Sequence, residues 1–298
     1  MLNQGARPET QALQAVLAVR AFRQKNVGVR ARVGSLALLS FLLGCEPNLI
    51  VGRWGGDGGE SGASGQASCD AAGGESNLSM TDPVAMPWST SFENEFCDYV
   101  AAGGYCYAAP RASYDTVASP AHSGKTAAAF SLVTDSAFDG LQARCVRQGE
   151  LPIAAYYSAY FFIPEAPTAA NNWNLMHFRG GDGVEAANGT WDLSLARQAD
   201  GSFQLFVYDH FRPAIRPTTN LPSVPIGEWF QLTAYLNRST DATGELAVYQ
   251  DGELGLRLTD LVTDRGAYGQ WYVGNLAVSL SPEETVLYVD DVAISDSL

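Results

Sequence analysis

The sequence has few basic residues, few histidines and no long apolar run. Lys and Arg number 18 against 32 Asp and Glu, so the formal net charge is −14, and there are three His. A chain this acidic is a poor partner for phosphate backbones, so we expect no nucleic-acid binding. No stretch approaches the ~18 consecutive apolar residues of a membrane-spanning helix, which argues against an integral membrane protein.

Several catalytic signatures are also missing. There is no Gly-rich phosphate-binding loop, no His-Glu-x-x-His zinc motif and no Gly-x-Ser-x-Gly nucleophile elbow. No expected strand carries the alternating acids that supply a nucleophile and an acid in many glycosidases. The pair Glu93 and Glu95 lies in an expected loop beside Cys97 and is a poor substitute. Hydrolytic chemistry is therefore disfavoured.

The chain is rich in aromatic residues. It holds 13 Tyr, 13 Phe and 6 Trp, and 46% of its residues are hydrophobic while 17% are charged. This balance is typical of a folded globular protein and not of a disordered one. The aromatic content favours β structure over a helical bundle.

The N-terminal segment has the features of an export signal. Two arginines precede the mainly apolar residues 34–43, and Gly44 and Cys45 follow. The run Leu42-Leu43-Gly44-Cys45 resembles the lipobox of bacterial lipoproteins, which implies cleavage before Cys45 and acylation of its thiol. Firm anchoring then needs more than one acyl chain. A plain secretory signal or a buried helix is the alternative. Residues 1–26 are long for such a signal, so an extended signal and a later start codon both stay open.

Three segments are expected along the chain: a signal at residues 1–44, a tether at 45–85 and one folded domain at 86–298. Residues 52–78 are mostly Gly, Ser, Ala, Asp and Glu, which is typical of a flexible linker. The roughly 210 residues that follow suit one β-sandwich. Without the signal, 12 basic and 31 acidic residues remain, a net charge of −19 that helps to keep an exported protein soluble.

Four cysteines remain once Cys45 is assigned to the lipid: Cys69, Cys97, Cys106 and Cys145. An even number in an exported chain indicates two structural disulfides, with three possible pairings. We favour Cys97–Cys106, because the loop between them is short enough to close on itself, together with Cys69–Cys145. A free Cys69 stays open as the alternative.

Short runs with alternating polarity dominate the domain, and turn signals such as Asp251-Gly252 separate them. This pattern predicts an all-β sandwich or jelly roll. The expected strands are residues 154–163, 173–179, 191–197, 203–211, 229–238, 245–250, 254–258, 270–276 and 285–294.

Most of these strands have one apolar face and one polar or aromatic face, because side chains alternate along a strand. If the strands share one sheet, the second faces merge into a surface on which sugar rings can stack and hydroxyls can bond. The residues expected there are Trp173, His177, Arg179, Tyr208, His210, Trp229, Gln231, Tyr235 and Tyr249. An ordinary solvated sheet face is the alternative.

The same surface holds the residue types that β-elimination requires. Cleaving a uronic-acid polymer this way needs a group that neutralises the carboxylate, a base for the C5 proton and an acid for the leaving oxygen. Arg or Gln can serve the first role, His or Tyr the second and Tyr the third. The candidate catalytic residues are His177, Arg179 and Tyr208, and the other six residues of the surface are candidate substrate contacts.

The strand order and hairpins resemble those of exported concanavalin A-like jelly-roll proteins, and in particular of heparin-lyase-like polysaccharide lyases. The stretches that carry the resemblance are Trp173–Phe178, Trp191–Leu195, Pro225–Phe230, Asp241–Gly244 and Tyr249–Gly252. The resemblance implies a jelly roll of the lectin and glucanase type with a concave binding groove. It also makes His177 the first catalytic candidate. Many members of this superfamily only bind, and no Lys stands on the expected groove strands, so a Lys-assisted mechanism does not transfer.

The two ends of the domain resemble the calcium-binding corner of many jelly-roll carbohydrate modules. Glu93 lies near the start, Asp290 and Asp291 lie in the last expected strand, and His122–Lys125 form a similar turn. Calcium takes 6–8 oxygen ligands, so carboxylates and turn carbonyls suit it. The resemblance implies a structural calcium ion held by Glu93 and one of the two aspartates. A solvated turn acid is the alternative.

We therefore expect an exported, lipid-anchored protein that binds a polysaccharide in a concave sheet groove. A polysaccharide lyase that acts by β-elimination is the alternative, and a surface structural or adhesion protein is the second alternative. The expected partners are a polysaccharide and, through the N-terminal lipid only, a membrane.

Overall fold

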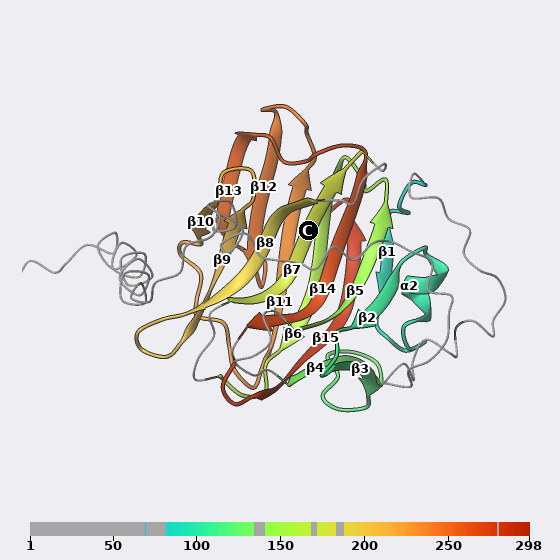
Figure 1. The fold of residues 1–298 in the computed structure, drawn as a ribbon, viewed down its shortest axis with the longest axis vertical. Helices are drawn as coiled ribbons and strands as arrows, with labels where there is room; N and C mark the ends of the chain where they lie inside the picture. Colours follow the sequence, from blue (N-terminus) through green and yellow to red (C-terminus); the bar gives the residue numbers. More distant parts are fainter. Residues whose placement is uncertain (1–68, 70–81, 134–140, 168–171, 183–187, 279) are drawn as a thin grey trace, which may run out of the picture. The chain divides into compact units, whose positions relative to one another are not determined.

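The computed structural model describes Cys69 and residues 82–133, 141–167, 172–182, 188–278 and 280–298. Two antiparallel sheets pack face to face as a jelly-roll sandwich, which confirms the predicted fold class (Figure 1). The expected signal, the lipidation site Cys45 and nearly all of the expected tether lie outside the described residues. Within the described part, no helix is long and apolar enough to cross a membrane.

The first layer is an eight-stranded sheet. Seven strands follow one another by hydrogen bonding, and the short strand β1 (Trp88–Thr90) pairs with β15. The order of the seven is β13 (Glu253–Leu261), β12 (Gly244–Gln250), β11 (Trp229–Asn237), β6 (Ala154–Phe162), β15 (Glu284–Ser295), β4 (Ala127–Val133) and β3 (Ala112–Val117).

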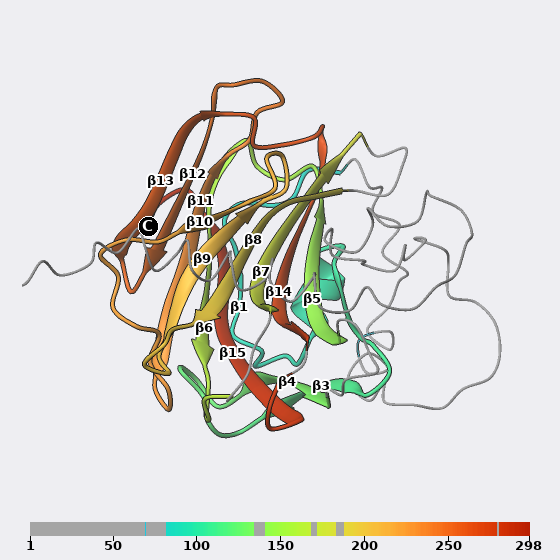
Figure 2. The ribbon, with the colours of Figure 1, turned by 60° about the vertical axis from the view of Figure 1, so that its left-hand side comes forward.

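The second layer is a seven-stranded sheet, which is seen beside the first in Figure 2. Its order is β10 (Ala214–Pro217), β9 (Phe203–Asp209), β8 (Asn188–Arg197), β7 (Asn172–Gly181), β14 (Tyr268–Val278), β5 (Leu141–Gly149) and β2 (Tyr105–Ala108). The short helix α2 (Cys97–Ala101) connects β1 to β2.

The core lies between the two sheets and is filled by the apolar face of each strand. Trp173, Trp191 and Trp271 of the seven-stranded sheet are fully buried, as are Phe161 and Phe230 of the eight-stranded sheet. A fully buried large apolar side chain contributes about 1.5–3 kcal/mol of hydrophobic free energy. The alternation of polarity along the strands therefore fixes which face of each sheet points inward.

The strands expected to form one polar–aromatic surface belong to two different sheets. Trp229, Gln231 and Tyr235 on β11 and Tyr249 on β12 lie on the outer face of the eight-stranded sheet. The prediction that they share a surface with His177 is wrong. The sorting of β11 and β12 into two faces was sound, but alternation within a strand does not tell which sheet the strand joins.

Trp173 is also misplaced by the sequence pattern. Its side chain is fully buried in the core, where it stacks edge-on against Phe203 and its indole N–H donates to Asn275. The pairing of β7 with β8 shifts register between Asn174 and Met176, as a β-bulge does. One extra residue reverses the face of every position before it, so Trp173 points away from the surface that His177 joins.

The disulfides join Cys69 to Cys97 and Cys106 to Cys145. The expected pairs Cys97–Cys106 and Cys69–Cys145 are therefore wrong, although all four cysteines are paired. Cys106 lies directly opposite Cys145 on the neighbouring strands β2 and β5, which is why these two bond. Two disulfides suit an oxidising compartment outside the cytoplasm.

Candidate active site

One row of directly paired residues crosses all seven strands of the seven-stranded sheet on its outer face. The row, from β2 to β10, is Tyr105, Val146, Tyr272, His177, Asp192, Tyr208 and Ile215. Neighbouring strands lie about 4.8 Å apart, so these side chains are close neighbours. The register of the sheet thus places His177 and Asp192 between the phenols of Tyr272 and Tyr208, although these residues are distant in sequence.

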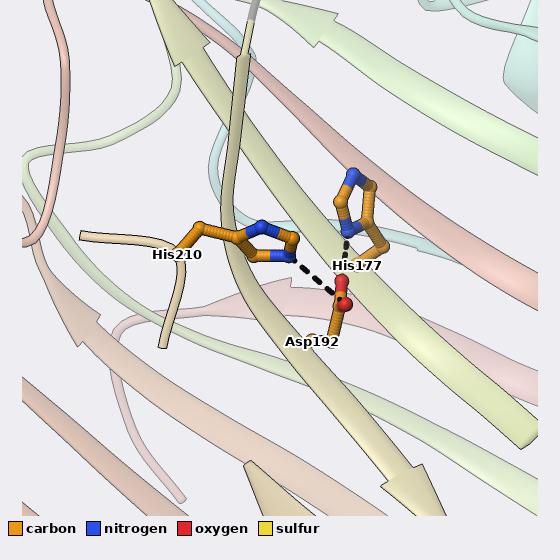
Figure 3. A group of neighbouring side chains, drawn as sticks. All are labelled: His177, Asp192 and His210. Carbon is orange, nitrogen blue, oxygen red and sulfur yellow. Dashed lines mark hydrogen bonds and ion pairs between the residues drawn. The ribbon is translucent and has the colours of Figure 1, made fainter. Parts of the chain in front are cut away.

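Asp192 holds two imidazoles at the centre of the row (Figure 3). One carboxylate oxygen contacts Nδ1 of His177, and the other lies 2.9 Å from Nε2 of His210. His210 follows β9, and its backbone N–H donates to the carbonyl of Thr190 on the neighbouring strand. A carboxylate can only accept, so both contacts require a ring N–H: Nδ1–H of His177 points at Asp192, and Nε2 is the other ring nitrogen.

The environment keeps Asp192 ionised. Burial alone would raise the pKa of its carboxyl, but the charge and hydrogen bonds of His177 and His210 hold the pKa well below its usual range. The ligand atoms of these three residues lie within 4.8 Å of one another, a set that suits a transition-metal ion such as zinc. The direct contacts equally suit a site without a metal, in which Asp192 fixes the orientation of the two imidazoles.

Arg144 supplies a buried positive charge on the same face. Its side chain is 2% exposed, Nη2 donates to Asn174 Oδ1 at 2.7 Å, and the guanidinium lies 5.6 Å from the ring centre of Tyr272. Nη1 makes no hydrogen bond to any residue that the structure describes. Gly274, with φ of 141°, pairs with Arg144, and a side chain there would collide with the β5 backbone. A buried cation whose hydrogen bond, among the described residues, goes to an amide is suited to an anionic ligand.

Two tyrosines flank the histidine pair. The rings of Tyr272 and His177 are 5.3 Å apart, and the hydroxyl of Tyr272 donates to Gln270 at 2.9 Å. Tyr208 packs edge-on against His210 at 4.9 Å. Burial, with the charges of Asp192 and Asp209, raises the pKa of Tyr208, so its hydroxyl stays protonated at neutral pH.

The structure brings together part of the set expected from the sequence. His177, Tyr208 and His210 meet around Asp192 on one face. Arg179 lies one row away, where it pairs with Gln270, and it is partly exposed.

Asp192, Arg144, Asn174 and Tyr272 were not expected. Asp192 lies directly opposite His177 on one neighbouring strand and Tyr208 on the other, and this placement can be recognised only once the strand pairing is known.

The residues expected to hold calcium lie around the 122–126 turn. Glu93 Oε1 accepts from the backbone N–H of Lys125 at 2.5 Å and of Thr126 at 2.9 Å. Asp290 is fully buried and accepts from the N–H of His122 at 2.9 Å. Asp291 instead contacts the His122 ring. Glu93 and Asp290 therefore bracket the 122–126 turn from both sides.

No protein-family model matches the chain, and no curated protein matches it. Solved structures do resemble it. The endo-β-1,4-glucuronan lyase of the fungus Trichoderma reesei superposes with a TM-score of 0.52 at 16% identity, over 65% of this chain and 90% of that chain. The alginate lyase of the marine Aplysia kurodai gives 0.51 at 12% identity, over 70% and 99%. At these identities the similarity establishes the two-sheet fold.

Proposed function

We propose that the protein is a polysaccharide lyase that cleaves a uronic-acid polymer by β-elimination on the outer face of the seven-stranded sheet. The observation that carries the proposal is the imidazole of His177, held by the ionised Asp192 on the sheet face that also carries Arg144, with the Tyr272 ring 5.3 Å from the His177 ring and 5.6 Å from the guanidinium. Two solved structures that share the fold are a glucuronan lyase and an alginate lyase, which is consistent with this chemistry.

Arg144 neutralises the substrate carboxylate in this proposal. Removing the C5 proton of a uronate leaves negative charge that spreads into the carboxylate, so a fixed cation nearby stabilises the transition state. The fork of N–H donors on the guanidinium matches the two oxygens of a carboxylate. Asn174 holds it in place through the 2.7 Å hydrogen bond.

His177 is the base. Asp192 holds Nδ1–H, so Nε2 takes the C5 proton, and the carboxylate stabilises the imidazolium that forms. The C5–H bond breaks, its electron pair forms the C4–C5 double bond, and the bond from C4 to the leaving oxygen breaks. Tyr272, on the next strand, would turn its O–H from Gln270 to that oxygen and donate the proton, so the products are a new chain end and an unsaturated sugar.

A surface that only binds is the second candidate. Half-buried Tyr and Gln side chains on the same sheet would bind sugar hydroxyls without any reaction. Binding alone gives no role to a carboxylate shared by two imidazoles, which is why elimination is preferred.

The test is an absorbance assay of the purified protein with a panel of uronic-acid polysaccharides. Elimination creates a conjugated double bond, so we expect absorbance in the near ultraviolet to rise, and His177→Ala to abolish the rise. His122→Ala is the matched control, because His122 lies at the 122–126 turn of the other sheet. Retention of polymer without product would favour binding, and the absence of both would favour an adhesion role.

Two further properties accompany the proposal. Glu93, Asp290 and turn carbonyls would hold a structural calcium ion, whose role is to fix the 122–126 turn. Each carboxylate oxygen has two lone pairs, so a metal contact is compatible with the N–H contacts seen. Export with acylation at Cys45 would place the domain at the cell envelope, and the two disulfides support an extracytoplasmic site.

A further inference from the structure

The outer face of the eight-stranded sheet is uncharged at its centre. The neighbouring strands β6 and β11 contain no Asp, Glu, Lys or Arg, although 17% of the residues in the chain are charged. A sheet face that only meets water is usually polar and carries charged side chains. Contact with solvent alone therefore does not account for the composition of this face.

Aromatic side chains occupy half of the outward positions on these two strands. Every second residue faces outward, which gives ten positions, and five of them are half-buried aromatic residues. The five are Tyr156, Tyr160, Phe162, Trp229 and Tyr235. A contiguous set of accessible rings on a folded protein marks an interaction surface.

The first group of rings lies where β6 ends and β11 begins. Trp229 lies opposite Phe162 with ring centres 5.5 Å apart, and Phe162 lies 6.0 Å from Tyr288 on β15. The ring of His122 stacks on Tyr160 at 3.6 Å and lies 5.7 Å from Trp229. These five side chains are the Trp229 group.

The second group lies about 20 Å away, because Tyr235 follows Trp229 by six residues on β11 at a rise of ~3.4 Å per residue. Tyr235 lies opposite Tyr156 with ring centres 4.9 Å apart. Tyr249 on β12 lies 6.3 Å from Tyr156. These three phenols are the Tyr235 group.

The face between the two groups is low and polar. Thr233 of β11 lies directly opposite Ser158 of β6, and both side chains are short. Gln231 and Asn237 are half-buried amides on the same face of β11. A ligand that reached both groups would therefore be long, and it would pass over hydroxyl and amide groups.

The charges beside the two groups neutralise one another. Arg257 on β13 lies 3.4 Å from Glu245 on β12 and donates to the hydroxyl of Tyr249. The imidazole of His122 contacts Asp291 at 2.6 Å. From residue 82 to the end, 26 acidic residues stand against 11 basic ones, so an anionic polymer meets a repulsive field. With no charge on β6 and β11 to attract an ion of either sign, the complementary ligand is uncharged.

We infer that the outer face of the eight-stranded sheet is a second polysaccharide-binding surface, and that its ligand is an extended, uncharged glycan. The rings of the Trp229 and Tyr235 groups stack on the C–H faces of the sugars, and the phenol and amide groups bond to sugar hydroxyls. This surface lies on the opposite side of the sandwich from His177 and Asp192. The protein would thus hold an uncharged polymer on one face while the other face cleaves a uronic-acid polymer.

Retention on insoluble polysaccharides tests the inference. The probes are cellulose, β-1,3-glucan and β-mannan, which carry no carboxylate and cannot undergo the elimination proposed above. We expect at least one of them to retain the purified protein, and Trp229→Ala combined with Tyr235→Ala to weaken retention by about tenfold or more. Tyr208→Ala removes a ring from the other sheet and should leave retention unchanged. Retention on none of the three probes overturns the inference.

A gain of charge tests the surface with every ring in place. Ser158→Glu sets a carboxylate between the two groups at a half-buried outward position, so retention should again weaken about tenfold. Gln204→Glu adds the same charge to the outer face of the seven-stranded sheet and should have no effect. Unchanged retention by Ser158→Glu, at an unchanged melting temperature, overturns the inference.

The second surface and the lyase proposal fail separately. His177→Ala should bind the uncharged probes like the wild type, whether or not the protein cleaves any uronic-acid polymer. If Tyr208→Ala loses retention and the Trp229 and Tyr235 variant keeps it, the polymer lies on the other sheet and the inference is wrong. If no probe retains the protein and Trp229→Ala converts a dimer into a monomer in sedimentation, the face is an interface between two copies, which also overturns the inference.

Discussion

Replacing Asp192 by Asn tests the central contact of the site. The carboxylate accepts one hydrogen from His177 and one from His210, whereas an amide offers one acceptor oxygen and one N–H donor group. One imidazole must then face a donor and change its tautomer. If that ring is His177, Nε2 carries a hydrogen and can no longer accept the C5 proton.

The size of the effect follows from the role assigned to the base. A positioned general base contributes about 10²–10⁴-fold, so kcat should fall by that factor, or roughly 2.7–5.5 kcal/mol of transition-state free energy. KM should change little, because the substrate hydroxyls are bound elsewhere. The free energy of unfolding should fall by about 1–3 kcal/mol, since charge-assisted hydrogen bonds are lost.

The assay is the initial rate of near-ultraviolet absorbance under saturating substrate, below the melting temperature of each variant. The matched control is Asp264→Asn, because Asp264 is also buried and bonded to a cation, Arg238, but lies outside the site. It should lower the melting temperature while kcat per folded protein is retained. A kcat for Asp192→Asn within about threefold of wild type would refute the role given to the carboxylate.

The other predictions concern charge, sheet identity, metal and acid. Arg144→Gln should lower kcat about 10²–10³-fold at unchanged melting temperature within a few degrees, and an unchanged rate would remove Arg144 from the site. Trp229→Ala should leave kcat/KM unchanged, because Trp229 lies on the eight-stranded sheet, and a large loss in the absorbance assay would contradict that placement. Chelation of calcium should lower the melting temperature in a thermal scan, and Asp290→Ala should remove this effect. An identical scan after chelation would argue against a bound calcium ion. Burial raises the pKa of the Asp192 carboxyl, but the histidine contacts lower the pKa by more. The ionised carboxylate therefore stabilises the folded state at pH values above the usual range of carboxyl pKa values. This stabilisation is lost as pH falls through the folded-state pKa, and Asp192→Asn should flatten the acid limb of an unfolding titration.

The sequence predicted nine strands near their observed bounds because their polarity alternates cleanly. The strand β5 was not expected, and with it Arg144 was missed. Its residues are buried on both faces, so polar and apolar positions do not alternate in exposure. Cys145 was considered only as a disulfide partner, although Gln142 and Arg144 flank Ala143 in the alternation typical of a strand.

Assigning strands to sheets was beyond the sequence. The chain crosses from the eight-stranded sheet at β6 to the seven-stranded sheet at β7, and returns at β11. Side chains alternate in the same way in both sheets, so a crossing between sheets leaves no mark on the sequence pattern. The aromatic faces of β9 and β11 therefore look alike in the sequence, although they point to opposite sides of the molecule. His177 and Tyr208 were found because they lie on strands of the same sheet, and Trp229 was misassigned because it does not.

The bond between Cys69 and Cys97 determines the effect of a single proteolytic cut on the chain. It closes a covalent ring across a sequence separation of 28 residues. A cut inside that ring leaves a nick, because both ends stay joined through sulfur. With the proposed acylation at Cys45, release of the domain would require a cut before Cys69, or a cut inside the ring followed by reduction. The disulfide thus separates positions where a single cut would release the domain from positions where it would not.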